Sequence, residues 1–152
     1  MAQTTTAIDS CAVEVWLDDD ATPGVLQNIS GSSTEIVPRF TQTLGDYHPR
    51  ASDWPSRLDG GKDAGVRLNV VYSTADDEGW DLLKDWWFAA SPGARTLTWY
   101  APDKTAGADM FSGEWRIRDL RWTHGASPAG PVVVTADLVP DGEVTQTTVD
   151  DS

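Results

Sequence analysis

The sequence predicts a mainly β fold: a β-sandwich or barrel of about seven strands with one α-helix packed on it. Several segments alternate apolar and polar residues, which is typical of strands with one buried face. Only residues 74–90 show a helical period. A single helix cannot supply the repeated strand–helix–strand units of a parallel sheet, so we expect it to cover a sheet. The 152 residues suffice for one hydrophobic core.

Three strands are expected in the first part of the chain, at residues 12–17, 25–31 and 33–44. The first ends at three consecutive aspartates and a Pro-Gly turn. The third contains Pro38, which has no N–H for a strand partner. We therefore expect this third strand to be bulged or to lie at a sheet edge.

Four more strands are expected in the second part, and one of them changes its apolar face midway. In residues 110–123, Trp115 and Ile117 share one parity, whereas Leu120 and Trp122 share the other. Such a change needs one extra residue. We expect a β-bulge near Arg118 and Asp119. The other expected strands are residues 66–72, 95–100 and 132–138.

The predicted helix begins acidic and becomes apolar. Trp80, Leu83 and Trp87 follow the i, i+3, i+7 pattern, so we expect all three to pack on the sheet. Ser73 or Thr74 is the expected N-cap, and Ser91-Pro92-Gly93 is the expected stop. Asp77, Asp81 and Lys84 are expected to face solvent or a neighbouring subunit.

Between the strands lies a long stretch, residues 45–65, that we expect to be an irregular loop. It is rich in glycine and contains two prolines. Long loops in compact domains are usually functional or docked on a neighbour. The residues expected to contact a second subunit or ring are Tyr47, Trp54, Leu58, Gly60 and Gly61.

Three parts of the chain are expected: an arm at residues 1–10, a β domain at 11–140 and a tail at 141–152. The arm and the tail have too little apolar content to fold alone. We expect them to be ordered only in an assembly, with Thr6 and Asp141 at contacts between subunits or rings.

Charge and composition exclude several functions. The formal net charge is −13, which disfavours an outer surface for DNA or anionic membranes. Cys11 is the only cysteine, so no internal disulfide is expected. The sequence shows neither a signal peptide nor a transmembrane segment, and a soluble product made in a cytoplasm is expected. The eight tryptophans favour core and interface roles.

No residues form a convincing catalytic pattern. His48 and His124 are read as ordinary loop residues, and no metal or cofactor is expected. Glu114 with Asp119 or Asp137 is the best carboxylate pair for a glycosidase, but a solvated, outward position on an alternating strand explains Glu114 without further assumptions and is preferred. The tryptophans that suit sugar stacking also suit the core: Trp16, Trp54, Trp99 and Trp122.

The order of the elements, and a few short motifs, resemble a known family. The motifs are Ile29-Ser30-Gly31, Leu58-Asp59-Gly60-Gly61, the helix with Trp80, Leu83 and Trp87, Leu97-Thr98-Trp99, and Phe111-Ser112-Gly113-Glu114. Over about residues 10–145 the chain resembles the major tail tube proteins of long-tailed bacteriophages, whose fold is shared with type VI secretion tube proteins.

The resemblance implies a virion structural protein and no enzyme. Copies would form stacked rings, six subunits each, and a hollow tail tube that delivers double-stranded DNA. The helix would lie outside the lumen barrel. The implied partners are further copies, a tape-measure protein and a tail terminator, with DNA only in transit and no membrane.

For a DNA conduit we expect a net negative lumen, because carboxylates repel phosphates. The lumen candidates are Glu35, Arg39 and Arg67, with Asp46 and Asp63 at the rim. Arg39 and Arg67 would then need acidic partners, since free guanidinium groups bind phosphate. Two alternatives stay open: another virion or secretion-tube structural protein, and a carbohydrate-binding or glycoside-active β protein.

Overall fold

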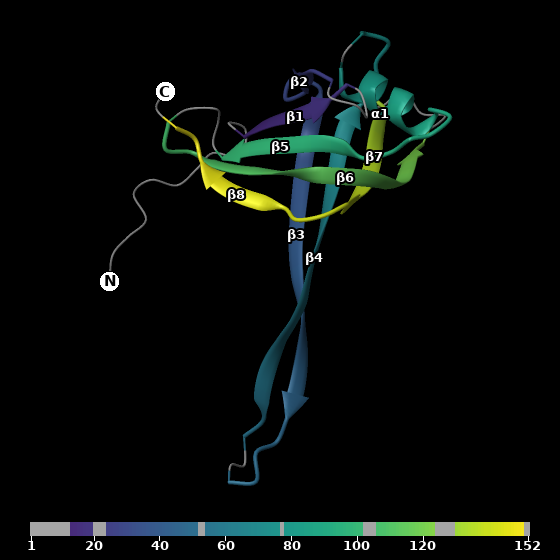
Figure 1. The fold of residues 1–152 in the computed structure, drawn as a ribbon. Coiled ribbons are helices and arrows are strands. Elements are labelled where there is room, and N and C mark those ends of the chain that lie inside the picture. The colour runs from purple at the N-terminus through teal and green to yellow at the C-terminus, as the bar shows by residue number, and fades with distance from the viewer. Residues whose placement is uncertain are drawn as a thin grey trace.

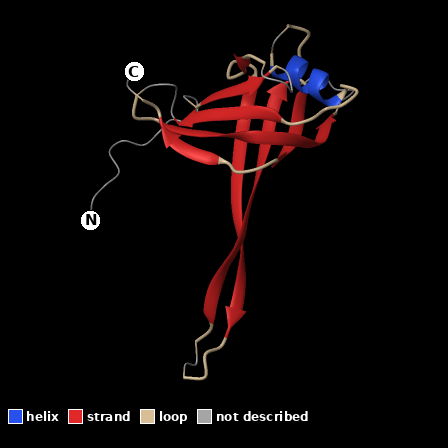
Figure 2. Cartoon of the chain, in the orientation of Figure 1, coloured by secondary structure: helices blue, strands red, loops and turns tan. Residues whose placement is uncertain are grey.

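The computed structural model describes residues 13–19, 24–51, 54–76, 78–101, 106–123 and 130–150. These residues form eight strands and one helix (Figures 1 and 2). In chain order they are β1 (Glu14–Asp18), β2 (Leu26–Asn28), β3 (Ser33–Tyr47), β4 (Ser56–Val71), α1 (Gly79–Trp87), β5 (Arg95–Ala101), β6 (Asp109–Trp122), β7 (Val133–Pro140) and β8 (Thr145–Thr148).

All eight strands belong to one antiparallel sheet, which confirms the mainly β fold with a single helix. Its order is β2-β1-β5-β6-β7-β4-β3, and β8 pairs with β6 beside this path. Figure 1 shows β1, β5 and β8 running across the direction of β3, β4 and β7, so the sheet folds over itself into two layers. β3 ends the order, which agrees with the edge position expected from Pro38.

β6 joins the two layers. Its first half pairs with β5 from Asp109 to Trp115, and its second half pairs with β7 from Trp115 to Trp122. The register shifts between Ile117 and Asp119, which confirms the predicted bulge. The extra residue reverses the parity of the strand, so apolar side chains can face the core on both sides of the bend.

The core lies between the two layers and beneath α1. Leu17, Leu68, Leu97, Leu138 and Trp115 are almost fully buried and come from five different strands. The helix adds four further buried side chains, of Trp80, Leu82, Leu83 and Trp86. Its main contacts are with β4, β1 and β6. The helix thus covers the sheet, as its single amphipathic segment predicts.

The helix is shorter than expected, and its predicted N-cap is wrong. It begins at Gly79, and the Ser32 hydroxyl, 47 residues earlier in the chain, accepts a hydrogen bond from the Gly79 N–H at 2.9 Å. Ser73 instead donates to the Glu78 carboxylate. A Cβ on Gly79 would lie 2.7 Å from Val70 Cγ1. Local sequence could not reveal a cap that tertiary contact supplies.

The expected packing of Trp87 is also wrong. Trp80 and Leu83 are buried, but Trp87 is 39% exposed, and Trp86 is fully buried in its place. The buried stripe is centred on Leu82, Leu83 and Trp86. Adjacent helical residues point about 100° apart, so Trp87 lies at the margin of that stripe.

The irregular loop expected at residues 45–65 is instead mostly strand. β3 extends to Tyr47, and β4 begins at Ser56. The two strands form a hairpin that projects far beyond the sheet (Figure 1). Gly60 and Gly61 therefore lie within β4 and form no corner. The many glycines suggested a loop. Instead, Gly60 and Gly61 lie on β4 opposite the register shift between Gln42 and Leu44, where the two strands form a bulge.

The tail expected at residues 141–152 is ordered in part within the single chain. Its residues Thr145–Thr148 form β8, which pairs with Asp109–Ser112 of β6. Four polar residues carry no apolar signal, but backbone pairing to an open edge requires none. The arm at residues 1–10, including Thr6, and Cys11 and His124 lie outside the described residues.

The bulge gives a sharp prediction for two neighbouring glycines. A Cβ on Gly60 would lie 2.5 Å from the Thr43 carbonyl oxygen, whereas one on Gly61 would meet nothing within 4 Å. We expect Gly60→Ala to strain the hairpin by about 1–3 kcal/mol. Amide exchange beyond Gln42 should then accelerate by roughly tenfold or more. Gly61→Ala is the matched control, and equal exchange in the two variants would contradict the assigned geometry.

Candidate functional site: the polar face of β3, β4, β7 and β6

One face of the layer formed by β3, β4, β7 and the second half of β6 is polar. Alternate residues of a strand point to opposite faces of a sheet. Where one residue of these strands points into the core, the next one in the sequence therefore points to the opposite, polar face. The cross-strand register aligns these neighbours into rows. We call this surface the polar face; its charged residues are Glu35, Arg39, Asp63, Arg67, Arg116, Arg118, Asp119, Arg121, Asp137 and, at its end, Asp141.

Asp137 is the centre of an ion-pair network on the polar face. Its carboxylate accepts from Arg67 Nε at 3.1 Å and from Arg121 Nη1 at 3.2 Å. Arg121 also reaches Asp119 at 2.6 Å. The side chains are about half exposed, except that of Asp137, at 27%. Exposed pairs contribute little to stability, typically below about 1 kcal/mol, so the network chiefly neutralises charge.

A second network, which contains hydrogen bonds but no ion pair, extends the polar face toward the end of β4. Asn69 donates to the Glu35 carboxylate at 3.1 Å and accepts from the Thr135 hydroxyl at 2.7 Å. Arg67, which pairs with Asp137, has the acidic partner that the sequence argument required. Within the part of the chain that the structure describes, no salt bridge reaches Arg39 or Arg118.

The excess of carboxylates expected here is not found. The ten charged residues of the polar face comprise five carboxylates and five guanidinium groups, so its formal charge is zero. Acids gather elsewhere, for example Asp76, Glu78, Asp81 and Asp85 in and before the helix. The net charge of −13 is that of the whole chain. It therefore did not reveal that the excess acids lie away from the polar face.

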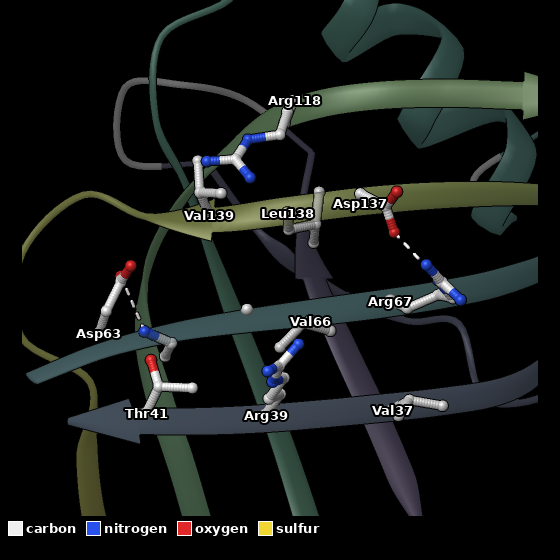
Figure 3. Close-up of a pocket in the computed structure, with 12 residues that line it drawn as sticks. Val37, Arg39, Thr41, Asp63, Val66, Arg67, Arg118, Asp137, Leu138 and Val139 are labelled. Atoms are coloured by element: carbon white, nitrogen blue, oxygen red, sulfur yellow. Dashed lines mark hydrogen bonds and ion pairs between the residues drawn. The ribbon is translucent and has the colours of Figure 1, made fainter. Parts of the chain in front are cut away.

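The polar face contains a hollow of about 540 Å³. Arg39 on β3 and Arg118 at the bulge of β6 lie on opposite sides of it (Figure 3). Gly65, directly opposite Arg39 in the register, forms part of the floor. The Asp63 carboxylate at one end accepts from the backbone N–H of Ala64 at 2.8 Å.

The structure brings together four of the five predicted lumen candidates. Glu35, Arg39, Asp63 and Arg67 share the polar face, whereas Asp46 pairs with Arg57 at 3.0 Å far along the hairpin. The sequence argument missed the central role of Asp137 and the contributions of Arg118, Asp119 and Arg121 to this face. The alternation of Thr135, Asp137 and Val139 against buried neighbours was the available signal.

The projecting hairpin carries an unusual share of exposed apolar side chains. Of twelve large apolar side chains exposed in the described chain, five lie on the part of the hairpin beyond the pairing of β4 with β7: Phe40, Leu44, Tyr47, Trp54 and Leu58. Trp54 is the most exposed, at 81%. Isolated two-stranded ribbons are marginally stable in water, and such a surface indicates a docking partner. Three predicted interface residues, Tyr47, Trp54 and Leu58, belong to this set. Asp141, by contrast, pairs with Arg116 at 3.2 Å.

The described residues proposed for a glycosidase or for sugar stacking do not gather into one site. The Glu114 carboxylate accepts from Thr96, while Asp119 and Asp137 share Arg121. Trp99 is buried and Trp54 lies on the hairpin. Burial, and secondarily the nearby Glu14, raises the pKa of Tyr100, which lies on β5 away from the polar face.

Two further searches of the described residues gave negative results. They contain no cluster of three or more His, Cys, Asp or Glu side chains arranged for a metal ion. The single helix within the same ranges is too short to span a membrane.

Comparison with known proteins shows the fold. No protein-family model matches the sequence, and no curated protein matches it either. Solved structures do match, among them the tail of an empty GTA particle refined with C6 symmetry. It has a TM-score of 0.70 and 16% identity, covering 93% of this chain and 100% of that one.

Two further matches extend the same result. The SPP1 tail tube has a TM-score of 0.75 and 12% identity, over 95% of this chain and 81% of that one. The sheath–tube complex of an extracellular contractile injection system, PVC, has a TM-score of 0.67 and 12% identity, over 95% and 94%. The chain therefore has the fold of tail tube proteins, which confirms the resemblance read from its sequence.

Proposed function

We propose that this chain is the structural subunit of a hollow tail tube, built from stacked rings, through which DNA is delivered. The observation that carries the proposal is the match of nearly the whole chain to tail tube and injection-system tube folds. In this role the chain binds copies of itself and performs no catalysis. The C6 symmetry of the GTA tail favours rings of six.

The strand order supports ring formation. β3 ends the sheet, and the second half of β6 has β7 on one edge and no strand of the described chain on the other. Exposed strand edges favour pairing with another chain. Because β3 and β6 run in opposite directions, β3 of one copy can extend the layer beyond β6 of the next as an antiparallel neighbour. Repeating this head-to-tail contact closes a ring.

In such a ring the polar face lines the channel. The other side of the layer is the subunit core, so only the polar face can contact the contents of a tube. The helix α1 lies on the core side, outside the channel. The hairpin of β3 and β4, with its exposed apolar side chains, docks on a neighbouring subunit or ring.

The remaining partners follow from this position in a virion tail. A tape-measure protein would occupy the channel during assembly, and a terminator would close the last ring. Among the similar structures are a tube-terminating cap and a sheath/tube terminator of injection systems. Synthesis in the host cytoplasm, with later incorporation into the tail, completes the proposal.

A second candidate is the tube of a contractile injection system. One observation favours it: similarity to the PVC sheath–tube complex. Both candidates predict a hollow tube. They differ in the material that passes through it, which would be protein in place of DNA.

Electron microscopy of the purified chain tests the shared claim. We expect rings or tubes with a central channel. A monodisperse monomer at high concentration, and especially one that binds glycans, would contradict the proposal and favour the carbohydrate-binding alternative.

Replacing Glu35 by Lys tests whether DNA passes the polar face. The change adds two positive charges per copy to a face that is neutral. We expect assembled particles to form but to eject DNA more slowly, with added salt restoring the rate. Asp85→Lys, on the exposed side of α1, is the matched control and should eject normally. Ejection at the wild-type rate by the Glu35 variant would show that DNA does not pass this residue.

A further inference from the structure

The hollow on the polar face is lined by three arginines, Arg39, Arg67 and Arg118, and by two carboxylates, Asp63 at one end and Asp137, which is paired with Arg67. We propose that Arg39 and Arg118 form a phosphate-binding groove that contacts the DNA backbone as it passes. This inference rests on the proposed channel role of the polar face. It departs from the expectation of a uniformly repelling channel.

The first argument concerns charge that the chain itself does not neutralise. Arg67 and Arg121 are paired with Asp137 and Asp119 at 2.6–3.2 Å. Arg39 and Arg118 line the hollow, and no salt bridge reaches either of them from a described residue. Guanidinium groups bind phosphate oxygens through two parallel N–H donors. Two such groups on opposite sides of one hollow can therefore hold a phosphodiester.

The second argument concerns space. Gly65 lies opposite Arg39 in the register, and a Cβ there would meet only the Leu138 carbonyl oxygen, at 3.9 Å. This distance is an ordinary van der Waals contact, so packing around the Gly65 Cα does not require glycine. A side chain at residue 65 would, however, occupy the floor of the hollow. The missing side chain thus leaves room between the two guanidinium groups.

The third argument concerns long-range repulsion. Five carboxylates and five guanidinium groups give the polar face no net charge. A phosphate approaching it meets no local excess of carboxylates. Carboxylates of a second copy of the chain could also pair with these two arginines in the hollow. Phosphate is favoured because the hollow opens on the face proposed to line the channel, and its 540 Å³ exceed what one carboxylate needs.

Binding of a 12-base-pair DNA duplex to the purified chain, measured by fluorescence anisotropy over a range of salt concentrations, tests the groove. We expect Arg39→Gln/Arg118→Gln to reduce the slope of log affinity against log salt by about 2, one for each lost phosphate contact. Gly65→Val should weaken binding severalfold although both arginines remain. Arg50→Gln/Arg57→Gln, which removes the same charge from the hairpin, should bind like wild type.

The outcomes separate the groove from the tube. Equal binding by the wild type and the groove variants, or equal losses in the groove and hairpin variants, would overturn the groove. Electron microscopy of the same variants supplies the second readout. If Arg39→Gln/Arg118→Gln binds DNA normally but forms no rings, the two arginines hold carboxylates of a second copy, and the phosphate assignment is wrong. If the wild-type chain forms no tubes, but DNA binding is lost selectively in the groove variants, the groove is supported and the tube is refuted.

Discussion

Trp86→Ala is expected to lower the free energy of unfolding by about 3–5 kcal/mol, because it removes a fully buried indole from the core. Further losses come from the bond that Trp86 Nε1 donates to the Gly93 carbonyl at 3.0 Å, and from its contact with the Arg95 guanidinium. Chemical denaturation of the unassembled chain, followed by tryptophan fluorescence and circular dichroism, measures the change.

Its neighbour supplies the control. Trp87 is the same residue type on the same helix, but it is 39% exposed. Trp87→Ala should therefore change the free energy of unfolding by less than about 1 kcal/mol. Equal destabilisation by the two substitutions, or a larger effect at Trp87, would show that the helix packs in a different rotation on the sheet.

Shortening the hairpin is expected to abolish polymerisation and leave a folded subunit. The register places Gln42 opposite Lys62, so a two-residue Asn-Gly turn can replace residues 43–61. The removed segment makes no contribution to the core, and the denaturation midpoint of the unassembled chain should stay near that of wild type. Electron microscopy should show neither tubes nor stacked rings.

A second variant separates hairpin length from hairpin chemistry. Leu44→Ser/Leu58→Ser keeps the hairpin but removes two apolar side chains that are 50% and 60% exposed. We expect weaker assembly, seen as a higher critical concentration. Normal tubes from the shortened chain would refute the docking role of the hairpin.

The parts of the fold that depend on local periodicity were predictable. Alternation identified most strands, the parity change in residues 110–123 identified the β6 bulge, and Pro38 indicated a strand that is bulged or at an edge. Two tertiary features were not. Ser32 caps α1 from a distant part of the chain. The hairpin lacks the usual apolar alternation because it has no core to face.

The polar face was predictable only in part. Strand parity placed Glu35, Arg39 and Arg67 together, but it could not reveal which residues of β7 and β6 lie beside them. Asp137 therefore entered as a catalytic candidate, although it neutralises Arg67 and Arg121. The overall charge of −13 suggested that this face is acidic. That expectation was wrong, because a net charge carries no information about where the acids lie.

A cryo-EM reconstruction of tubes assembled from the purified chain tests the central claim most directly. The expected map has β3, β4, β7 and the second half of β6 around a central channel, the side chains of Arg39, Arg67 and Asp137 on the channel wall, and α1 on the outside. A reconstruction in which α1 or the β1–β5 layer lines the channel, or in which the polar face is buried between subunits, would contradict the account.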